Sequence, residues 1–335
     1  MLVTQEPVLR RFWYPVMPVA QLTDGPQSFQ LLGQPLVLWR TATGEPAALA
    51  DRCCHRTAQL SKGIVQNGCV RCPYHGWSFN AEGTCVKVPQ LDPDATIPKT
   101  YRVPSFRCQE RYGYVWVCLD PAPLQSIPAI PEADAVENRL IPQFYEPWQV
   151  SGLRLMENSF DNAHFSIVHA ESFGNQEAPQ PAKSEIVPLA MGLKVYATVP
   201  VVNPPSQRKN LGIADTMTVR HVESTWYVPF SRTLKITYPN GLMHLIFTAA
   251  TPIDDQTSQV VQFCIRNDTE EQARAEDIIA FDRQVVNEDK YVLESTTYDT
   301  PLDIAAEQHM PSDQPGIIMR HQLAALVQGK IPQGS

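Results

Sequence analysis

Two short cysteine–histidine pairs lie within one segment of the sequence, CCHRTAQLSKGIVQNGCVRCPYHGW, which covers residues 53–77. Cys53 and His55 form a Cys-x-His pair, and Cys72 and His75 form a Cys-x-x-His pair after sixteen intervening residues. Two thiolates and two imidazoles therefore arrive on two short loops. A fold that uses these side chains must bring both loops together, so this segment constrains the architecture more than any other.

Thiolates and imidazoles in this proportion are the ligand set of a Rieske [2Fe-2S] centre, in which two histidines replace two cysteines on one iron. The neutral imidazoles make the cluster less negative and raise its reduction potential, which suits a group that receives and passes on single electrons. The alternative is a zinc site held by thiolates, for which the sequence offers Cys53, Cys54, Cys69 and Cys72.

The residues around the two pairs favour the cluster. The second pair lies in the phrase CPYHGW, and the first histidine is followed by Arg56, Leu60 and Gly63, none of which a zinc ribbon needs. Together they resemble the Rieske domain of the non-haem iron ring-hydroxylating oxygenases. The resemblance implies a cluster held by both pairs, namely by Cys53, His55, Cys72 and His75. Cys54 stands where this family commonly has Pro, and Thr57 where it commonly has Gly.

A proline-rich stretch divides the chain. From Phe12 to about Asp120, short β-like runs separated by turn residues predict a small antiparallel β domain. Residues 120–147 contain six prolines, which disfavour helix and strand interiors, so this stretch is predicted to be a linker. We place the boundary inside it, with a Rieske domain at residues 1–125 and a catalytic domain at residues 126–335.

A second group of ligand-type residues follows in MENSFDNAHFSIVHAESFG, residues 156–174. Its apolar residues fit a helix, which would put Asn158, Asp161 and His164 on one face. His169 would lie about a turn and a half beyond. Two imidazoles and one carboxylate on one face of an iron leave the opposite face open for dioxygen. Spacing and order match the oxygenase pattern, which implies His164 and His169 as iron ligands and assigns catalytic roles to Asp161 and Asn158.

The third iron ligand must come from elsewhere in the chain. The segment AEDIIAFDRQVVNEDKYVLES, residues 275–295, has the alternation of apolar and acidic residues of an amphipathic helix. In the family, a C-terminal helix supplies this carboxylate from an Asp that follows an acidic residue or Gln. Asp289 resembles that Asp best, and Asp282 is the alternative.

Between these two predicted helices, residues 183–266 contain apolar or alternating runs that predict an antiparallel sheet. A curved sheet wrapped over the helices that carry the iron would form a substrate cavity. His221 and His244 lie inside these runs, and we interpret them as core or cavity-lining residues. The predicted fold class is α+β, with an antiparallel β Rieske domain followed by a START-like catalytic domain of helices and a curved antiparallel sheet.

Composition limits the partners. The net charge of -8 and the lack of a basic stripe argue against nucleic acid. No uncharged run approaches a membrane span, and the N-terminus does not resemble a signal peptide, so we expect a cytoplasmic protein. The sequence has no Rossmann-type glycine fingerprint. The NAD(P)H chemistry is therefore expected in a separate ferredoxin or flavin reductase.

The resemblance also implies an activity and an assembly. It looks most like the homotrimeric branch with vanillate and dicamba demethylases and saxitoxin-pathway hydroxylases. In that branch a cluster histidine of one subunit meets an iron ligand of its neighbour through an Asp, which corresponds here to His75, Asp161 and His164. The expected activity is that of a monooxygenase that hydroxylates or demethylates a small organic substrate with mononuclear Fe(II). The alternative is a Rieske electron carrier with a ligand-binding second domain.

Overall fold

The computed structural model describes residues 1–92 and 94–331. The chain forms two compact units. One contains residues 3–127 and 251–255, and the other contains residues 1–2, 128–250 and the chain from residue 256 on. No described helix is both long enough and apolar enough to cross a membrane.

The N-terminal unit consists of two antiparallel sheets, which confirms the predicted small β domain. The six-stranded sheet has the order β1-β10-β9-β4-β3-β2. Its strands are β1 (Tyr14–Pro18), β2 (Gln27–Leu31), β3 (Gln34–Arg40), β4 (Pro46–Ala50), β9 (Ser105–Arg111) and β10 (Tyr114–Cys118). The four-stranded sheet runs in chain order through β5 (Ile64–Gln66), β6 (Cys69–Arg71), β7 (Ser78–Phe79) and β8 (Cys85–Lys87).

A tight hairpin joins the two cysteine–histidine loops. Asn67 and Gly68 connect β5 to β6, and both have positive φ angles, 52° and 74°. Two positive φ angles are the requirement of a type I′ turn, for which Asn-Gly is the preferred sequence. This turn fixes the register of β5 and β6, and therefore the separation of the loops that precede and follow them.

The C-terminal unit is built on one seven-stranded antiparallel sheet of order β11-β17-β16-β15-β14-β13-β12. The strands are β11 (Arg139–Trp148), β12 (Ser184–Leu189), β13 (Gly192–Val202), β14 (Met217–Tyr227), β15 (Ser231–Thr237), β16 (Met243–Pro252) and β17 (Ser258–Arg266). The sheet predicted for residues 183–266 is therefore confirmed, and with it the α+β class.

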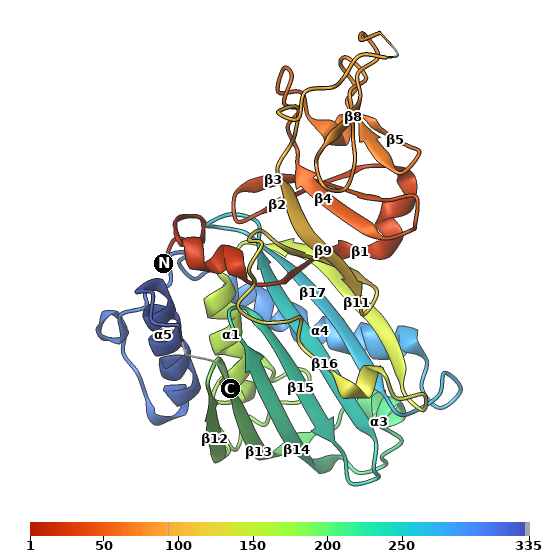
Figure 1. Ribbon diagram of the computed structural model, residues 1–335. Coiled ribbons are helices and arrows are strands. Elements are labelled where there is room, and N and C mark those ends of the chain that lie inside the picture. Colours follow the sequence, from red (N-terminus) through yellow and green to blue (C-terminus); the bar gives the residue numbers. More distant parts are fainter. Residues whose placement is uncertain (93, 332–335) are drawn as a thin grey trace. The chain divides into compact units, whose positions relative to one another are not determined.

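Five α-helices accompany the described part of this sheet: α1 (Gly152–Phe160), α2 (Phe165–Val168), α3 (Pro205–Leu211), α4 (Ala275–Leu293) and α5 (Gln314–Val327). Figure 1 shows α4 crossing one face of the sheet. Ile278 of α4 is buried there against Ile141 and Cys264 of the sheet, as expected for the apolar face of an amphipathic helix.

Two predictions about local structure are wrong. The linker predicted for residues 120–147 gives way to strand β11 from Arg139 onward. Its prolines are tolerated because β11 is the edge strand and pairs only with β17, so a missing N–H need not break a ladder on both sides. The single helix predicted to carry Asn158, Asp161 and His164 on one face is also absent, because α1 ends at Phe160 and a separate short helix begins at Phe165.

Candidate metal centres

The two loops of the N-terminal unit have the same backbone design. The N–H of Thr57 donates to Cys53 O (3.0 Å), and the N–H of Cys53 donates to Ala58 O (2.8 Å). In the second loop the N–H of Gly76 donates to Cys72 O (3.1 Å), and the N–H of Cys72 donates to Trp77 O (2.8 Å). Each loop thus curls around its own cysteine.

Both loops need a left-handed residue at the same place. Gly76 has φ +73°, and Thr57, its counterpart in the first loop, has φ +60°. Glycine adopts this conformation without strain, whereas a β-branched residue is an outlier there. The position at which Thr57 departs from the family pattern is therefore a position where the backbone itself favours glycine.

The four side chains of these loops suit a two-iron cluster. The rings of His55 and His75 have centroids 4.5 Å apart, and Nδ1 of His55 is buried without a hydrogen-bond partner. Trp77 stacks on the His55 ring at 4.5 Å and holds its orientation. A buried imidazole nitrogen without a hydrogen-bond partner, beside a second imidazole, is suited to bind a metal.

The two cysteines of the loops are buried. Burial, together with a hydrogen bond that the Cys53 thiol forms with Cys72, raises the pKa of the Cys53 thiol to about 12. A thiolate at this place therefore requires a cationic partner, which the irons of a cluster would supply. The zinc alternative needs four thiols within reach of one ion, and the part of the chain that the structure describes contains no such group.

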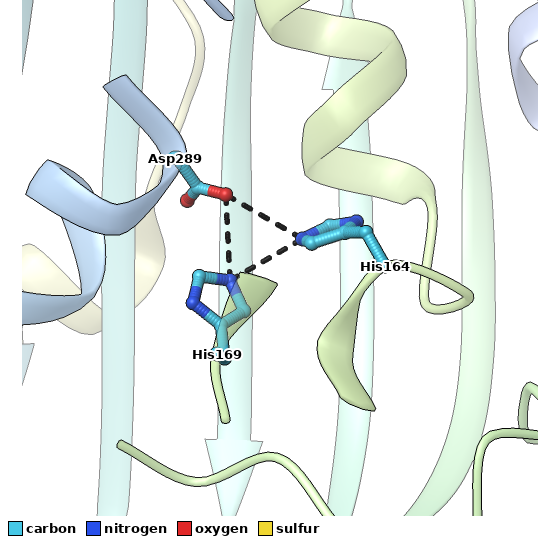
Figure 2. A group of neighbouring side chains, drawn as sticks. All are labelled: His164, His169 and Asp289. Carbon is cyan, nitrogen blue, oxygen red and sulfur yellow. Dashed lines mark hydrogen bonds and ion pairs between the residues drawn. The ribbon is translucent and has the colours of Figure 1, made fainter. Parts of the chain in front are cut away.

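The second centre lies in the C-terminal unit and combines three segments (Figure 2). His164 directly precedes α2, His169 directly follows it, and Asp289 lies on α4. Helix α1 ends before His164 because the carboxylate of Asp161 accepts the N–H of Ala163 at 2.7 Å, a local turn that competes with continued helix. The break turns His164 toward His169.

Three donor atoms meet at one point. Nε2 of His164 lies 3.2 Å from Nε2 of His169, and Oδ1 of Asp289 lies 3.5 Å and 3.3 Å from these two nitrogens. Ligands that bind one ion at about 2.1 Å lie roughly 3.0 to 3.4 Å from one another, depending on the geometry. The spacing of the three atoms therefore fits one metal ion held by two histidines and one carboxylate.

Carboxylates on the far side of each imidazole fix the ligand nitrogens. Nδ1 of His164 lies 3.1 Å from Oδ2 of Asp161, and Nδ1 of His169 lies 2.8 Å from Oε2 of Glu288. An Nδ1–H that donates to a carboxylate leaves the Nε2 lone pair free to bind a metal. Both histidines are thus set in the same tautomer.

The charged side chains of this site shift each other's pKa values. Burial alone would raise the pKa of Asp289, but hydrogen bonds from His164 and His169 hold it well below its usual range. Burial likewise opposes protonation of His164, yet hydrogen bonds with Asp161 and Asp289 raise the pKa of His164 to about 9. The site therefore favours positive charge between the donors, which a divalent cation can provide in place of a proton.

The other predicted residues are also placed. Asn158 donates from Nδ2 to Oδ1 of Asp289 (3.0 Å), so it orients that carboxylate. Asp282, the alternative third ligand, lies instead beside His244, with Oδ2 of the acid 3.3 Å from Nε2 of the imidazole. Gln143 donates a short hydrogen bond to the same carboxylate. The structure thus places Asp289, and not Asp282, with the two histidines.

Comparison with known proteins identifies the family. Residues 12–107 match the Rieske [2Fe-2S] domain, and residues 148–329 match the C-terminal domain of vanillate O-demethylase oxygenase. The chain belongs to the Rieske oxygenases. Its cofactors are accordingly the [2Fe-2S] cluster and a mononuclear iron.

Relatives cover most of this Rieske oxygenase. Methylxanthine N1-demethylase NdmA of Pseudomonas putida is 31% identical over 308 residues, which is 88% of this chain and 83% of the relative. The structure of NdmA with caffeine has a TM-score of 0.82 at 28% identity and covers 97% of this chain and 93% of its own. Dicamba monooxygenase bound to 3,6-dichlorosalicylic acid has a TM-score of 0.84 at 24% identity, covering 97% of this chain and 99% of its own, a likeness of fold.

A cavity adjoins the three metal-donor residues of this Rieske oxygenase. Its empty space is about 1120 Å³, counting the solvent space to which it opens. Its walls come from the sheet, from helices α1, α2, α3 and α4 and from the loops beside them. They include all three donor residues, apolar sheet residues such as Val222 and Ile236, and His244, which confirms the interpretation of that histidine.

Sequence reasoning missed several polar residues of this site. Glu288 gave no signal of its own because it is one of several acids on α4, and only the fold brings it to His169. Arg220 and Arg232 lie on strands β14 and β15 and line the cavity, although arginine in a strand more often points to solvent. Alternation along the strands could have placed Arg220 on the same face as Val222, but not its surroundings.

Proposed function

We propose that this Rieske oxygenase is a monooxygenase that hydroxylates or oxidatively demethylates a small organic substrate. The observation that carries this proposal is that Nε2 of His164, Nε2 of His169 and Oδ1 of Asp289 converge beside a largely apolar cavity. These three residues would hold an iron that supplies the activation of dioxygen, and a substrate in the cavity would lie next to it. NdmA is named as a methylxanthine N1-demethylase, which supports demethylation as one of these two outcomes.

The reaction consumes one dioxygen, two electrons and two protons: R–H becomes R–OH, and the second oxygen atom leaves as water. If the oxidised carbon is a methyl group on nitrogen or oxygen, the hydroxymethyl product breaks down to formaldehyde and the free amine or alcohol. The iron, when bound, supplies the activation of dioxygen. The protein residues around it supply position and charge.

Three contacts define those roles. Asp161 and Glu288 keep a proton on Nδ1 of His164 and His169, so that each Nε2 faces the metal. Asn158 fixes the rotamer of Asp289 through its amide. The apolar sheet residues give the space where the substrate would bind an apolar wall, which would reduce the access of water to the reacting groups.

Electrons are proposed to come from a separate ferredoxin or flavin reductase, since the sequence has no nicotinamide-binding fingerprint. They would enter at the cluster held by Cys53, His55, Cys72 and His75. We further propose a homotrimer in which His75 of one subunit approaches Asp161 of the next. Asp161 suits this role because its carboxylate contacts His164 while 28% of its side chain stays exposed. Cytoplasmic location remains a prediction from the sequence.

Metal analysis is the first test. A monooxygenase should contain about three irons per two acid-labile sulfides in each chain, whereas an electron carrier with a binding domain would contain about two. Reduced protein is then exposed to ¹⁸O₂ with a mixed pool of methoxyaromatics, N-methyl heterocycles, sterol-like compounds and guanidinium alkaloids. One ¹⁸O in a product, or formaldehyde with loss of a methyl group, is expected. A full iron count without either product across the pool would contradict the proposal.

The electron bridge has its own test. Asp161→Asn removes the charge but keeps the size of the side chain, so both metal centres should remain loaded. Turnover should fall by at least 10-fold, and single-turnover oxidation of the pre-reduced cluster should slow by the same factor. The control is Asp134→Asn, which makes the same substitution at an exposed position. Asn162→Asp would not serve as a control, because it adds a charge beside the bridge. Normal cluster oxidation in Asp161→Asn would rule out the bridge.

A further inference from the structure

One buried cation in the cavity has no counter-charge. Arg220 lies on β14, faces the cavity and is only 7% exposed. Its Nε and Nη2 are buried and form no hydrogen bond with any residue that the structure describes. Its described contacts are with aromatic rings: the guanidinium carbon lies 4.9 Å from the centre of the Phe173 ring and 5.6 Å from that of Tyr238.

The acids that line the same cavity are already engaged. Asp161 pairs with His164, and Asp289 faces both His164 and His169. Asp282 accepts from Gln143 and faces His244. A buried guanidinium is costly unless it is paired, and stacking on aromatic rings compensates only part of its lost hydration. The positive charge of Arg220 is therefore available to a ligand.

The free atoms of Arg220 have the geometry of a carboxylate receptor. Nε and Nη2 lie on one edge of the guanidinium and bind both oxygens of a carboxylate side by side. The same edge binds carboxylates elsewhere in the described part of the chain. Nε and Nη2 of Arg266 both bind Asp268, and Nε and Nη2 of Arg320 both bind Glu157. At Arg220 no carboxylate of a described residue binds this edge.

Arg232, the other arginine of the cavity, differs in this respect. Its buried atoms without a partner are Nε and Nη1, which do not share one edge of the guanidinium. The strand register also sets the two arginines apart. Arg232 pairs with Trp226 of β14, six residues along that strand from Arg220, a backbone separation of roughly 20 Å. Because their backbones are this far apart, the two arginines do not form one clamp around a single carboxylate. Arg220 is therefore the better receptor.

Arg220 lies close to the proposed iron site. The Phe173 ring stacks on His169 with centroids 4.7 Å apart, and Arg220 contacts that same ring at 4.9 Å. The guanidinium is therefore no farther from the His169 ring than the sum of these two distances. The sheet residues that line the same cavity include the apolar side chains of Val222, Ile236 and Ile246. A molecule bound here would meet one cation and an apolar surface within the length of a substituted aromatic acid.

From this we infer that the substrate is an organic acid whose carboxylate binds side-on to Nε and Nη2 of Arg220 while its apolar body lies along the sheet toward the metal ligands. The inference rests on the proposed function, which it narrows by excluding cationic substrates such as guanidinium alkaloids. An apolar body explains the cavity walls, and the carboxylate explains the unpaired cation.

Binding to the metal-loaded protein tests the inference without turnover. In the absence of oxygen, calorimetry compares four acids with their primary amides: benzoate, 4-methoxybenzoate, 2-naphthoate and indole-3-acetate. At least one acid should bind roughly 10- to 100-fold more tightly than its amide, since a buried charged hydrogen-bond pair replaces a neutral one. Phenylguanidine should bind more weakly than any acid that binds.

Variants of Arg220 test whether this arginine causes the preference for acids. In Arg220→Gln the preference for the acid should fall to less than about twofold, with iron and labile sulfide unchanged. Arg220→Lys keeps the charge but loses the two-atom edge, so an intermediate preference for the acid is expected. If the Gln variant does not fold, the Lys variant provides the test in its place. Exposed Arg274→Gln is the matched control and should leave the preference intact.

Three results would overturn the inference: no acid is preferred over its amide, phenylguanidine binds best, or the acid preference survives in Arg220→Gln. Survival would mean that the acid binds the iron or Arg232 directly. The proposed function fails separately. If acids bind through Arg220 but none of them gains ¹⁸O or loses a methyl group as formaldehyde, the monooxygenase proposal fails and the receptor stands. If a neutral substrate turns over equally in Arg220→Gln, the receptor fails and the activity stands.

Discussion

Oε2 of Glu288 lies 2.8 Å from Nδ1 of His169, on the side of the imidazole opposite to the metal-donor group. The next residue in the chain, Asp289, faces the other nitrogen of the same ring at 3.3 Å. Two consecutive acids of α4 therefore hold one histidine from both sides. Ser172 donates to the same oxygen of Glu288 at 2.7 Å and keeps that carboxylate in place.

The first prediction concerns Glu288. Glu288→Ala removes the acceptor that fixes the tautomer of His169, so the affinity for the mononuclear iron should fall roughly 10- to 100-fold, as for other partners of metal-binding histidines. Iron titration of the protein with its cluster intact measures this change. Glu276→Ala, an exposed position on the same helix, is the control, and Glu288→Gln should lose less because its amide oxygen still accepts. Equal iron affinity in Glu288→Ala and Glu276→Ala would show that Glu288 does not position His169.

The second prediction separates the two candidate carboxylates. Asp289→Ala should reduce the iron content from about three to about two per chain and leave the labile sulfide at two, because only the mononuclear site loses a ligand. Asp282→Ala should keep all three irons, since Asp282 contacts His244 and Gln143 instead of the metal-donor histidines. Loss of iron in Asp282→Ala alone would reverse the assignment.

The third prediction uses the matched loops of the N-terminal unit. Thr57 is exposed and holds φ +60°, so Thr57→Gly relieves left-handed strain of about 1–2 kcal/mol and leaves no cavity. Part of this gain is offset by the greater freedom of glycine in the unfolded chain, about 0.5–1 kcal/mol. A net increase of about 0.5–1 kcal/mol in the free energy of unfolding is expected, seen as a small rise in the temperature at which the cluster absorbance is lost.

Gly76→Ala gives the opposite change in the other loop. A Cβ there would lie 3.1 Å from Cγ of Pro89, on a backbone with φ +73°. The cluster absorbance should be lost at a lower temperature. Asn67→Gly is the control for a positive φ that the native residue already tolerates, and it should change little. A lower temperature in Thr57→Gly would mean that the two loops are not equivalent.

The fold was predictable from the sequence where the signal is local. Strand runs of alternating or continuous apolar residues gave the sheet of residues 183–266, and the amphipathic pattern gave α4. Strand β11 was missed because its prolines look like a linker, and only the position of the strand at the sheet edge makes them acceptable. The end of α1 was missed because Asp161 forms a turn with Ala163, a choice that apolar periodicity does not register.

The residues of the site likewise divide into those with a local sequence signal and those without one. His164 and His169 were recognised because both belong to one short segment with a characteristic spacing, and Asp289 because of its neighbours. Arg220 was not recognised, since what distinguishes it is the absence of a partner for a buried charge. Such an absence depends on every residue that packs around the guanidinium, and it becomes visible only when the strands of the sheet are placed side by side.

The last prediction concerns the anchor of α1. Arg320 on α5 is buried and binds Glu157 of α1 at 2.5 Å together with Glu307, and Arg154 binds the same two acids. Arg320→Met should lower the free energy of unfolding by about 3 kcal/mol, because it leaves a buried carboxylate less well paired. Arg274→Met breaks an exposed pair with Glu276 and should cost less than about 1 kcal/mol.

The destabilisation caused by Arg320→Met should be larger at neutral pH than at acidic pH. Burial alone would raise the pKa of Glu307, but hydrogen bonds from Arg320 and Arg154 lower it below its usual value. A carboxyl with a lowered pKa in the folded state stabilises the protein above its unfolded pKa of about 4.3, and this contribution is lost as the pH falls further. The difference in melting temperature between wild type and Arg320→Met should therefore be largest near pH 7 and shrink below about pH 4. A difference that stays constant down to that pH would show that Arg320 acts through packing and not through its ion pairs.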